Sequence, residues 1–130
     1  MIITKEILDN LSAQAKANPR LRMNYDLRNS EADMSQRMLN ALEPKTEIPI
    51  HRHTKSSEVV TIIRGAIQEN FYDEKGVLIE SIVLKQCGEI PLLVVPKATW
   101  HNLVCLEPDT IILECKDGAY EPLKEEDILY

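Results

Sequence analysis

The sequence predicts an all-β barrel preceded by one α-helix, and three observations support this fold class. Short runs rich in β-branched residues recur along the chain and are separated by turn signals. A single helical stripe lies near the start and is followed by Asn18-Pro19, a pair that ends helices. With 130 residues, of which 44% are hydrophobic, the chain is long enough to form one domain around a single core.

The helix is expected over residues 4–17, with Thr4 as its cap and an apolar stripe that packs on the outside of the barrel. A polar connector, residues 19–33, follows it. Strands are expected at residues 36–42, 48–53, 59–64, 66–72, 77–84, 92–95, 101–105 and 111–115, with a hairpin turn at 73–76. We therefore divide the chain into an N-terminal helix and arm (1–35), a barrel (36–122) and an acidic C-terminal tail (123–130).

The strand expected at residues 59–64 is largely apolar on both faces. Val60 and Ile62 share one face, while Val59 and Ile63 share the other. One face must line the barrel, and the other must be covered. A second copy of the chain is the simplest cover, so we expect a homodimer.

All three histidines lie in two short stretches, residues 51–53 and 96–101. In a strand, residues i and i+2 point the same way and lie about 7 Å apart, so His51 and His53 can converge on one ion. Residues 54–57 are polar and allow the chain to reverse, so Glu58 can face back toward the pair. Imidazole and carboxylate ligands suit iron, manganese, nickel, copper or zinc and leave coordination positions open. We expect His51, His53, Glu58 and His101 to hold one divalent transition metal, whose identity the spacing leaves open.

These stretches also resemble a known family. The spacing H-x-H-x4-E-x6-G, from His51 to Gly65, resembles the first motif of the cupin superfamily, and Pro96-x-Ala98-x-x-His101 resembles its second motif. From about residue 3 to residue 122 the chain resembles the WbuC-type cupin-fold metalloproteins. The segments that carry this resemblance are Pro19–Arg22, Gln36-Arg37, Pro49–His53 and Lys116–Tyr120. The resemblance implies a double-stranded β-helix, or jelly-roll barrel, and a role in bacterial surface polysaccharide biosynthesis.

The chain departs from the family's pattern at several positions. Lys45 and Ala98 stand where the pattern has glycine, and Cys105 stands where it has asparagine. Gly88 lies further from Pro96 than the pattern asks. None of these changes removes a metal ligand. Each makes the family a poorer guide to the loop structure of this chain.

Six residues are candidate substrate contacts. They are Arg22, Asn24, Arg37, Arg64, Trp100 and Tyr120. Arginine offers a planar fork for phosphate or carboxylate, and connectors beside a rigid scaffold often carry binding groups, although a solvated loop is the simpler interpretation. Trp100 either packs at the barrel rim or stacks on a sugar or base. The family resemblance suggests that Tyr120 folds back over the pocket, and alternation places Cys105 either in that pocket or in the core.

Composition argues against several classes of partner. The net charge is -6 and no basic cluster occurs, so a nucleic-acid partner is not expected. No apolar run reaches the length of a membrane span, and the start of the chain does not resemble a signal peptide. The three cysteines are an odd number and predict reduced thiols. We expect a cytoplasmic protein with a small-molecule ligand.

Several functions fit this pattern. The first is an enzyme whose metal acts as a Lewis acid on a sugar or nucleotide sugar, for example in isomerisation. Without metal, His51 or His101 could serve as the base of an isomerase. The other hypotheses are an iron-dependent dioxygenase, a non-catalytic module that binds or senses a small ligand, and a structural subunit of a glycan-assembly complex.

Overall fold

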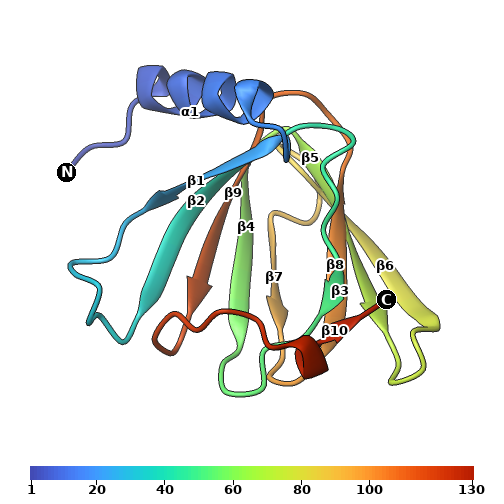
Figure 1. The fold of residues 1–130 in the computed structure, drawn as a ribbon. Coiled ribbons are helices and arrows are strands. Elements are labelled where there is room, and N and C mark those ends of the chain that lie inside the picture. Colours follow the sequence, from blue (N-terminus) through green and yellow to red (C-terminus); the bar gives the residue numbers. More distant parts are fainter.

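The computed structural model describes all residues, 1–130, as two five-stranded antiparallel sheets with one α-helix outside the first sheet (Figure 1). The elements are α1 (Lys5–Ala17), β1 (Arg22–Asp26), β2 (Gln36–Leu42), β3 (Ile50–His51), β4 (Glu58–Arg64), β5 (Ala66–Tyr72), β6 (Leu78–Lys85), β7 (Leu92–Val95), β8 (Trp100–Cys105), β9 (Thr110–Lys116) and β10 (Ile128–Leu129), with a short 3-10 helix at Glu125–Asp127. The strand order is β1-β2-β9-β4-β7 in the first sheet and β10-β3-β8-β5-β6 in the second. The predicted barrel with its N-terminal helix is confirmed.

Most of the predicted elements lie within one or two residues of the observed ones, but two expectations were wrong and one strand, in the C-terminal tail, was not predicted. The connector at residues 19–33 contains β1, which pairs with β2 from Arg22↔Leu42 to Asp26↔Met38. The strand expected at 48–53 is reduced to Ile50–His51. The tail contains β10, which pairs with β3. β3 and β10 have only two residues each, so their pairing depends on distant segments that local sequence does not reveal. In β1, Met23 and Tyr25 alternate with polar residues, a strand signal that the polar composition of the connector obscured.

Helix α1 packs on the outer face of the first sheet, as its apolar stripe predicts. The Thr4 hydroxyl accepts a hydrogen bond from the Ile7 amide at 3.3 Å and caps the helix. Leu11 and Ala15 are buried against a cluster on the sheet, which consists of Leu39, Ala41 and Ile111. No helix in the structure combines the length and apolar character needed to cross a membrane.

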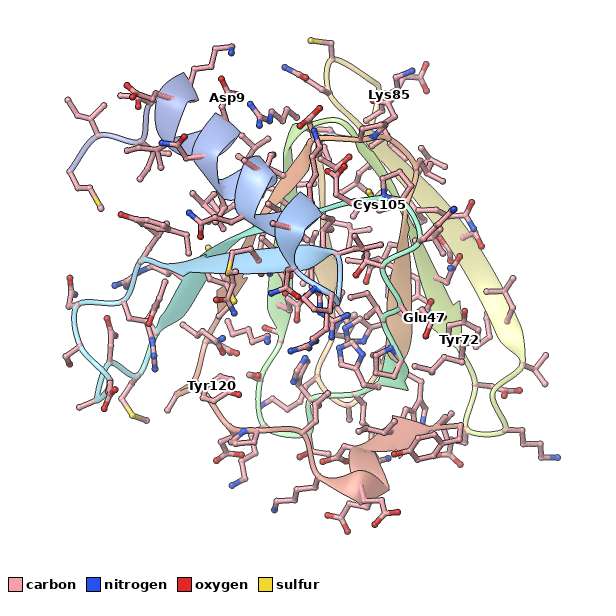
Figure 2. All side chains as sticks on the ribbon, turned by 45° about the horizontal axis from the view of Figure 1, so that its top comes forward. Asp9, Glu47, Tyr72, Lys85, Cys105 and Tyr120 are labelled. Atoms are coloured by element: carbon pink, nitrogen blue, oxygen red, sulfur yellow. The ribbon has the colours of Figure 1, made fainter.

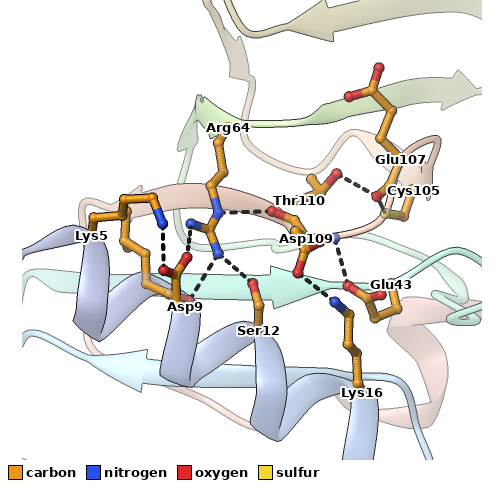
Figure 3. A network of polar contacts seen from close by, with 11 residues as sticks. Lys5, Asp9, Ser12, Lys16, Glu43, Arg64, Cys105, Glu107, Asp109 and Thr110 are labelled. Carbon is orange, nitrogen blue, oxygen red and sulfur yellow. Dashed lines mark hydrogen bonds and ion pairs between the residues drawn. The ribbon is translucent and has the colours of Figure 1, made fainter.

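Arg64 fastens the helix to the barrel (Figure 3). Its guanidinium donates to the Asp9 carboxylate at 2.7 Å, to the Ser12 hydroxyl at 2.8 Å and to the Asp109 carbonyl at 2.9 Å. Lys16 of the same helix forms an ion pair with the Asp109 side chain at 2.6 Å. This polar network lies on the helix side of the barrel, so Arg64 has a structural role there.

The space between the two sheets is apolar at one end and polar at the other. Along the inner face of β4, Glu58 is followed by Val60 and Ile62, and along β9 Ile112 is followed by Glu114 and Lys116. The apolar end forms the core, whose buried members are Leu42, Val60, Ile62, Ile67, Leu84, Val95, Cys105 and Ile112. This division leaves the opposite end of the barrel free to hold polar groups. The Cys105 thiol belongs to the core, as one of the two interpretations of its position predicted.

Three positions of the family pattern, Gly65, Lys45 and Ala98, have a positive φ angle, which is the conformation that favours glycine. Gly65 has φ +80°, and a Cβ atom there would meet the Thr110 Cα at 2.8 Å, so only glycine fits between β4 and β5. Lys45 and Ala98, which stand where the related pattern has glycine, also adopt positive φ, at 75° and 62°. Both positions therefore have the left-handed backbone conformation that favours glycine.

Candidate metal centre

Three histidine side chains meet at the polar end of the barrel. His51 of β3 and His101 of β8 are direct partners in the register of the second sheet. Their ring centroids lie 4.3 Å apart, and the ring of His53 lies 5.1 Å from His51 and 5.8 Å from His101. One ring nitrogen from each histidine lies within 4.8 Å of those of the other two, a spacing that allows all three to contact one ion.

Backbone carbonyls fix the orientation of two of these rings. The Nδ1 of His51 lies 2.8 Å from the Pro49 carbonyl, and the Nδ1 of His101 lies 2.8 Å from the Thr99 carbonyl. Because a carbonyl oxygen only accepts, each Nδ1 carries the proton and each Nε2 keeps its lone pair. Metal-binding histidines are oriented by the same kind of second contact.

Burial keeps the three imidazoles neutral at physiological pH. It lowers the pKa of His51 to about 4 and that of His53 to about 3, with smaller contributions from neighbouring positive groups. Burial likewise lowers the pKa of His101. Since neutral imidazole is the form that binds metals, the site needs to release no proton from these rings before it takes up an ion.

The predicted fourth ligand, Glu58, lies beside this cluster and is 4% exposed. Its Oε2 is 3.5 Å from the Nε2 of His53 and 3.7 Å from the ammonium of Lys116. Because His53 is neutral near pH 7, the first of these contacts is not an ion pair. The ring nitrogens that lie within 4.8 Å of one another thus come from three of the four predicted ligands, with Glu58 as an immediate neighbour.

Two further buried carboxyl groups, Glu69 of β5 and Glu114 of β9, occupy the same interior. Burial, followed by the charges of Glu58 and Glu114, raises the pKa of Glu69 to about 9. Burial and the neighbouring Glu58 raise the pKa of Glu114 to about 8, and the Asn40 amide donates to its carboxyl group at 2.5 Å. Both groups are therefore protonated near neutral pH, so the interior carries less negative charge than three carboxylates would give.

Three buried polar atoms in this region have no hydrogen-bond partner: Glu58 Oε2, Glu69 Oε2 and His101 Nε2. An unpaired buried polar atom costs about 1–3 kcal/mol, so such atoms are few in folded proteins and indicate a missing partner. All three side chains line one cavity of about 330 Å³, together with His51, His53, Glu114 and Lys116.

The segment after β9 crosses the polar end of the barrel and returns to β3 (Figure 1). Asp117 accepts a hydrogen bond from the Ser57 amide at 2.8 Å, and Arg52 donates to the Asp127 carboxylate at 2.9 Å. Tyr120, which is 53% exposed, contributes to the cavity wall from this segment (Figure 2). The cavity is therefore bounded on one side by residues that follow β9 in sequence.

The six candidate substrate contacts separate into two groups in the structure. Arg22, Asn24 and Tyr120 line the cavity, although the Arg22 guanidinium also donates to the Glu47 carbonyl at 2.6 Å. The other three lie outside its lining. Arg37 forms an ion pair with Asp33, Arg64 contacts α1, and the Trp100 ring lies under the Arg52 guanidinium at 4.5 Å.

Glu69 and Glu114 were not among the predicted site residues. For Glu69 a signal was available, because alternation in β5 places it on the same face as Ile67 and Phe71, which are apolar. For Glu114 the signal was ambiguous, because both faces of β9 carry apolar residues.

Comparison with known proteins shows a family match and a shared fold. Residues 3–84, more than half of the chain, match the family described as "Domain of unknown function (DUF6016)". No curated protein matches the sequence.

Among solved structures, oxalate oxidase in complex with glycolate superimposes with a TM-score of 0.66 at 13% identity, over 83% of this chain and 56% of that chain. KdgF from Halomonas sp. gives 0.61 at 17% identity, over 80% and 84%. A mutant of Bacillus subtilis oxalate decarboxylase OxdC gives 0.60 at 19% identity, over 76% and 26%. The chain thus spans about half of the oxalate oxidase chain and a quarter of the decarboxylase chain. At these identities the likeness concerns the fold alone, and it confirms the cupin jelly-roll barrel.

Proposed function

Because the chain belongs to the DUF6016 family, a domain of unknown function, we propose its function from the geometry of the barrel's polar end. The chain binds one divalent transition metal through His51, His53, His101 and Glu58. It uses this centre to bind and activate a small oxygen-bearing molecule, with a sugar or nucleotide sugar as the favoured class.

One observation carries the proposal: three neutral imidazoles present ring nitrogens within 4.8 Å of one another in the cavity at the polar end of the barrel. Two of them have the Nδ1 proton committed to a backbone carbonyl. Two buried atoms without a hydrogen-bond partner, His101 Nε2 and Glu58 Oε2, also indicate that these residues can hold a metal. A cation bound between them would contact both atoms. Three nitrogens and one carboxylate oxygen suit iron, manganese, nickel or zinc.

The chain's own residues would define how a ligand binds there. The metal, when bound, supplies a Lewis acid that polarises a carbonyl or hydroxyl oxygen of the ligand. Glu58 and His101, at 4% and 2% exposure, would hold that oxygen in the barrel interior rather than at its surface. Amide groups of Asn24 and Asn40 on the cavity wall offer donors and acceptors for ligand hydroxyl groups. This lining, together with the resemblance to WbuC-type proteins, favours a polyhydroxylated ligand and a role in polysaccharide biosynthesis.

Iron-dependent oxygen chemistry is a second candidate. The donor set of three imidazoles and one carboxylate favours it, since a transition metal bound in this way keeps positions open for oxygen and substrate. A centre that binds its ligand without turnover is the third candidate, and only assays of conversion separate it from the first two.

We also propose that two copies of the chain associate. Helix α1 covers part of the outer face of the first sheet, whereas Leu92 and Val94 of its edge strand β7 remain about half exposed. A partner that covers these residues would remove apolar surface from water. Sedimentation analysis of the purified chain, beside a Leu92→Lys/Val94→Lys variant, tests this: a dimer that the variant loses supports it, and a wild-type monomer contradicts it.

Elemental analysis of untagged protein tests the metal proposal. We expect one metal per chain in the wild type and none in the His51→Ala/His53→Ala variant. Val104→Ala is the matched control, because Val104 lies on β8 with His101 but is 45% exposed outside the cavity, and it should keep the metal. Iron would direct the next assays to oxygen consumption, and zinc, nickel or manganese would direct them to sugar isomerisation. A wild type that takes up no metal after reconstitution contradicts the proposal.

A further inference from the structure

One unpaired atom of the cavity is left without a partner even if a metal occupies the histidine cluster. A metal would satisfy His101 Nε2 and Glu58 Oε2, because both belong to the proposed ligand set. Glu69 Oε2 belongs to none of the predicted ligands and has no hydrogen bond in the structure. Its partner is therefore a molecule that enters the cavity, either water or a ligand bound beside the metal.

The position of Glu69 places it close to the metal ligands. It lies on β5 opposite Leu103 of β8, two residues before Phe71, whose partner is His101. Strand alternation puts Glu69 and Phe71 on the inner face, and diagonal neighbours across adjacent strands lie within reach of long side chains. Glu69 and His101 accordingly line the same cavity from adjacent strands.

Packing alone does not explain why a glutamate stands at this position. The side chain is 1% exposed and forms no ion pair, since Lys116, the cation near the cluster, lies against Glu58. Its strand neighbours on the inner face are Ile67 and Phe71, both apolar. A leucine would fill similar space and bury no polar atom, so an unpaired carboxyl group lowers the stability of the fold unless a ligand contacts it.

We infer that Glu69 is a ligand-contacting residue, which accepts a hydrogen bond from a hydroxyl group of the molecule bound at the metal. This inference rests on the proposed function and specifies its ligand class: a small molecule with a hydroxyl group next to a second oxygen, as in sugars, polyols and 2-hydroxy acids. A carboxyl group has an acceptor oxygen whether or not it is protonated, so the contact does not depend on its titration. Glu69 thus selects a hydroxyl-bearing ligand over one of similar size that lacks the hydroxyl.

Paired titrations of the metal-loaded protein with glycolate and acetate test this role. The two probes share a carboxylate and differ in the hydroxyl group. We expect the wild type to prefer glycolate, the Glu69→Leu variant to lose about tenfold of that preference, and the Glu69→Gln variant to keep most of it, because its amide oxygen still accepts. Metal content, measured by elemental analysis, should be the same in all three proteins.

The outcomes separate this inference from the metal proposal. One metal per chain and an unchanged preference for glycolate in Glu69→Leu would overturn the role of Glu69 and leave the metal centre intact. A wild type that binds both probes equally, or neither, would also overturn it. A wild type without metal overturns the proposed function instead, and the same titrations on the metal-free protein then decide on Glu69, whose unpaired oxygen does not depend on a metal.

Discussion

His51 and His101 face each other as direct partners across β3 and β8, and each ring is held by the carbonyl group two residues before it. The two contacts have the same length, 2.8 Å, and involve the same ring atom. The centre is thus built from one local arrangement used twice, on two strands that the sheet places side by side. The orientation of both lone pairs follows from backbone geometry and needs no further side chain.

Replacing Glu58 with glutamine should lower metal affinity at least about tenfold, or about 1.4 kcal/mol, because a neutral amide binds a divalent cation more weakly than a carboxylate. Competition with a chromophoric chelator measures this. Glu80→Gln is the control, since Glu80 is an exposed carboxylate on β6 of the second sheet. Equal affinity in Glu58→Gln and the wild type would limit the ligands to the three histidines.

Metal affinity should change little between pH 7 and about pH 5 and fall steeply below about pH 4. Protons compete for a histidine only as the pH approaches its pKa, and burial lowers the pKa of His51 to about 4 and that of His53 to about 3. Chelator competition at a series of pH values checks this. A loss of affinity that begins near pH 6.5, the ordinary pKa of histidine, would contradict the burial that the structure shows.

Glu69→Gln should reduce the loss of stability that the metal-free protein suffers as the pH rises. The folded pKa of Glu69, about 9, lies above its ordinary value of 4.5, so the folded chain keeps a proton that the unfolded chain releases above pH 4.5. The associated stability is complete below pH 4.5 and is lost progressively up to about pH 9. Urea unfolding midpoints at pH 5, 7 and 9 measure the slope. Glu114 contributes in the same direction, so the slope should become shallower without vanishing, and identical slopes would contradict this prediction.

Ala98→Gly and Lys45→Gly should each stabilise the protein by about 0.5–1 kcal/mol. A left-handed conformation costs a residue with a Cβ atom about 1–2 kcal/mol, while glycine adds about 0.5–1 kcal/mol of entropy to the unfolded chain. Denaturant titration measures both changes. Ala13→Gly, in the middle of α1, is the opposite control and should destabilise by about 1 kcal/mol. A destabilised Ala98→Gly would show that the alanine methyl group makes a contact worth more than the strain.

Arg52→Ala should loosen the segment that closes the polar end of the barrel. The variant loses a hydrogen bond to Asp127 and a cation–π contact with Trp100, a combined loss of about 1–3 kcal/mol. Hydrogen exchange should become faster in residues 117–129 and stay unchanged in α1. Uniform acceleration over the whole chain would indicate global destabilisation instead.

The sequence predicted the elements that local patterns determine and missed those that depend on distant partners. Strand alternation and turn residues located β2, β4 and β5 almost to the residue. The spacing of His51 and His53 predicted that the two rings would converge, and the structure brings His101 to them. By contrast, β1 and β10 were missed for different reasons. Met23 and Tyr25 of β1 do alternate with polar residues, but the polar composition of the connector obscured this pattern. β10 has only two residues and is a strand because β3 lies beside it.

Side-chain partners were the hardest features to predict. Arg64 shares the parity of Glu58, yet its guanidinium reaches α1 because the strand register shifts between Ile62 and Arg64. Trp100 turns away from the cavity and packs with Arg52, and Arg37 pairs with Asp33. Charge and residue type identified these side chains as able to bind a ligand, but only the three-dimensional arrangement shows which of them already have partners inside the protein.

The pairing of β3 with both β8 and β10 has a consequence for biosynthesis. A nascent chain that has left the ribosome as far as His53 contains two of the three histidines but lacks β8 and β10, the strands that pair with β3. His101 follows only after most of the barrel has been made, and the strand that flanks His51 on its other side, Ile128–Leu129, follows later still. The three-histidine cluster and the strands on both sides of His51 are therefore complete only after the residues of β8 and β10 have been made.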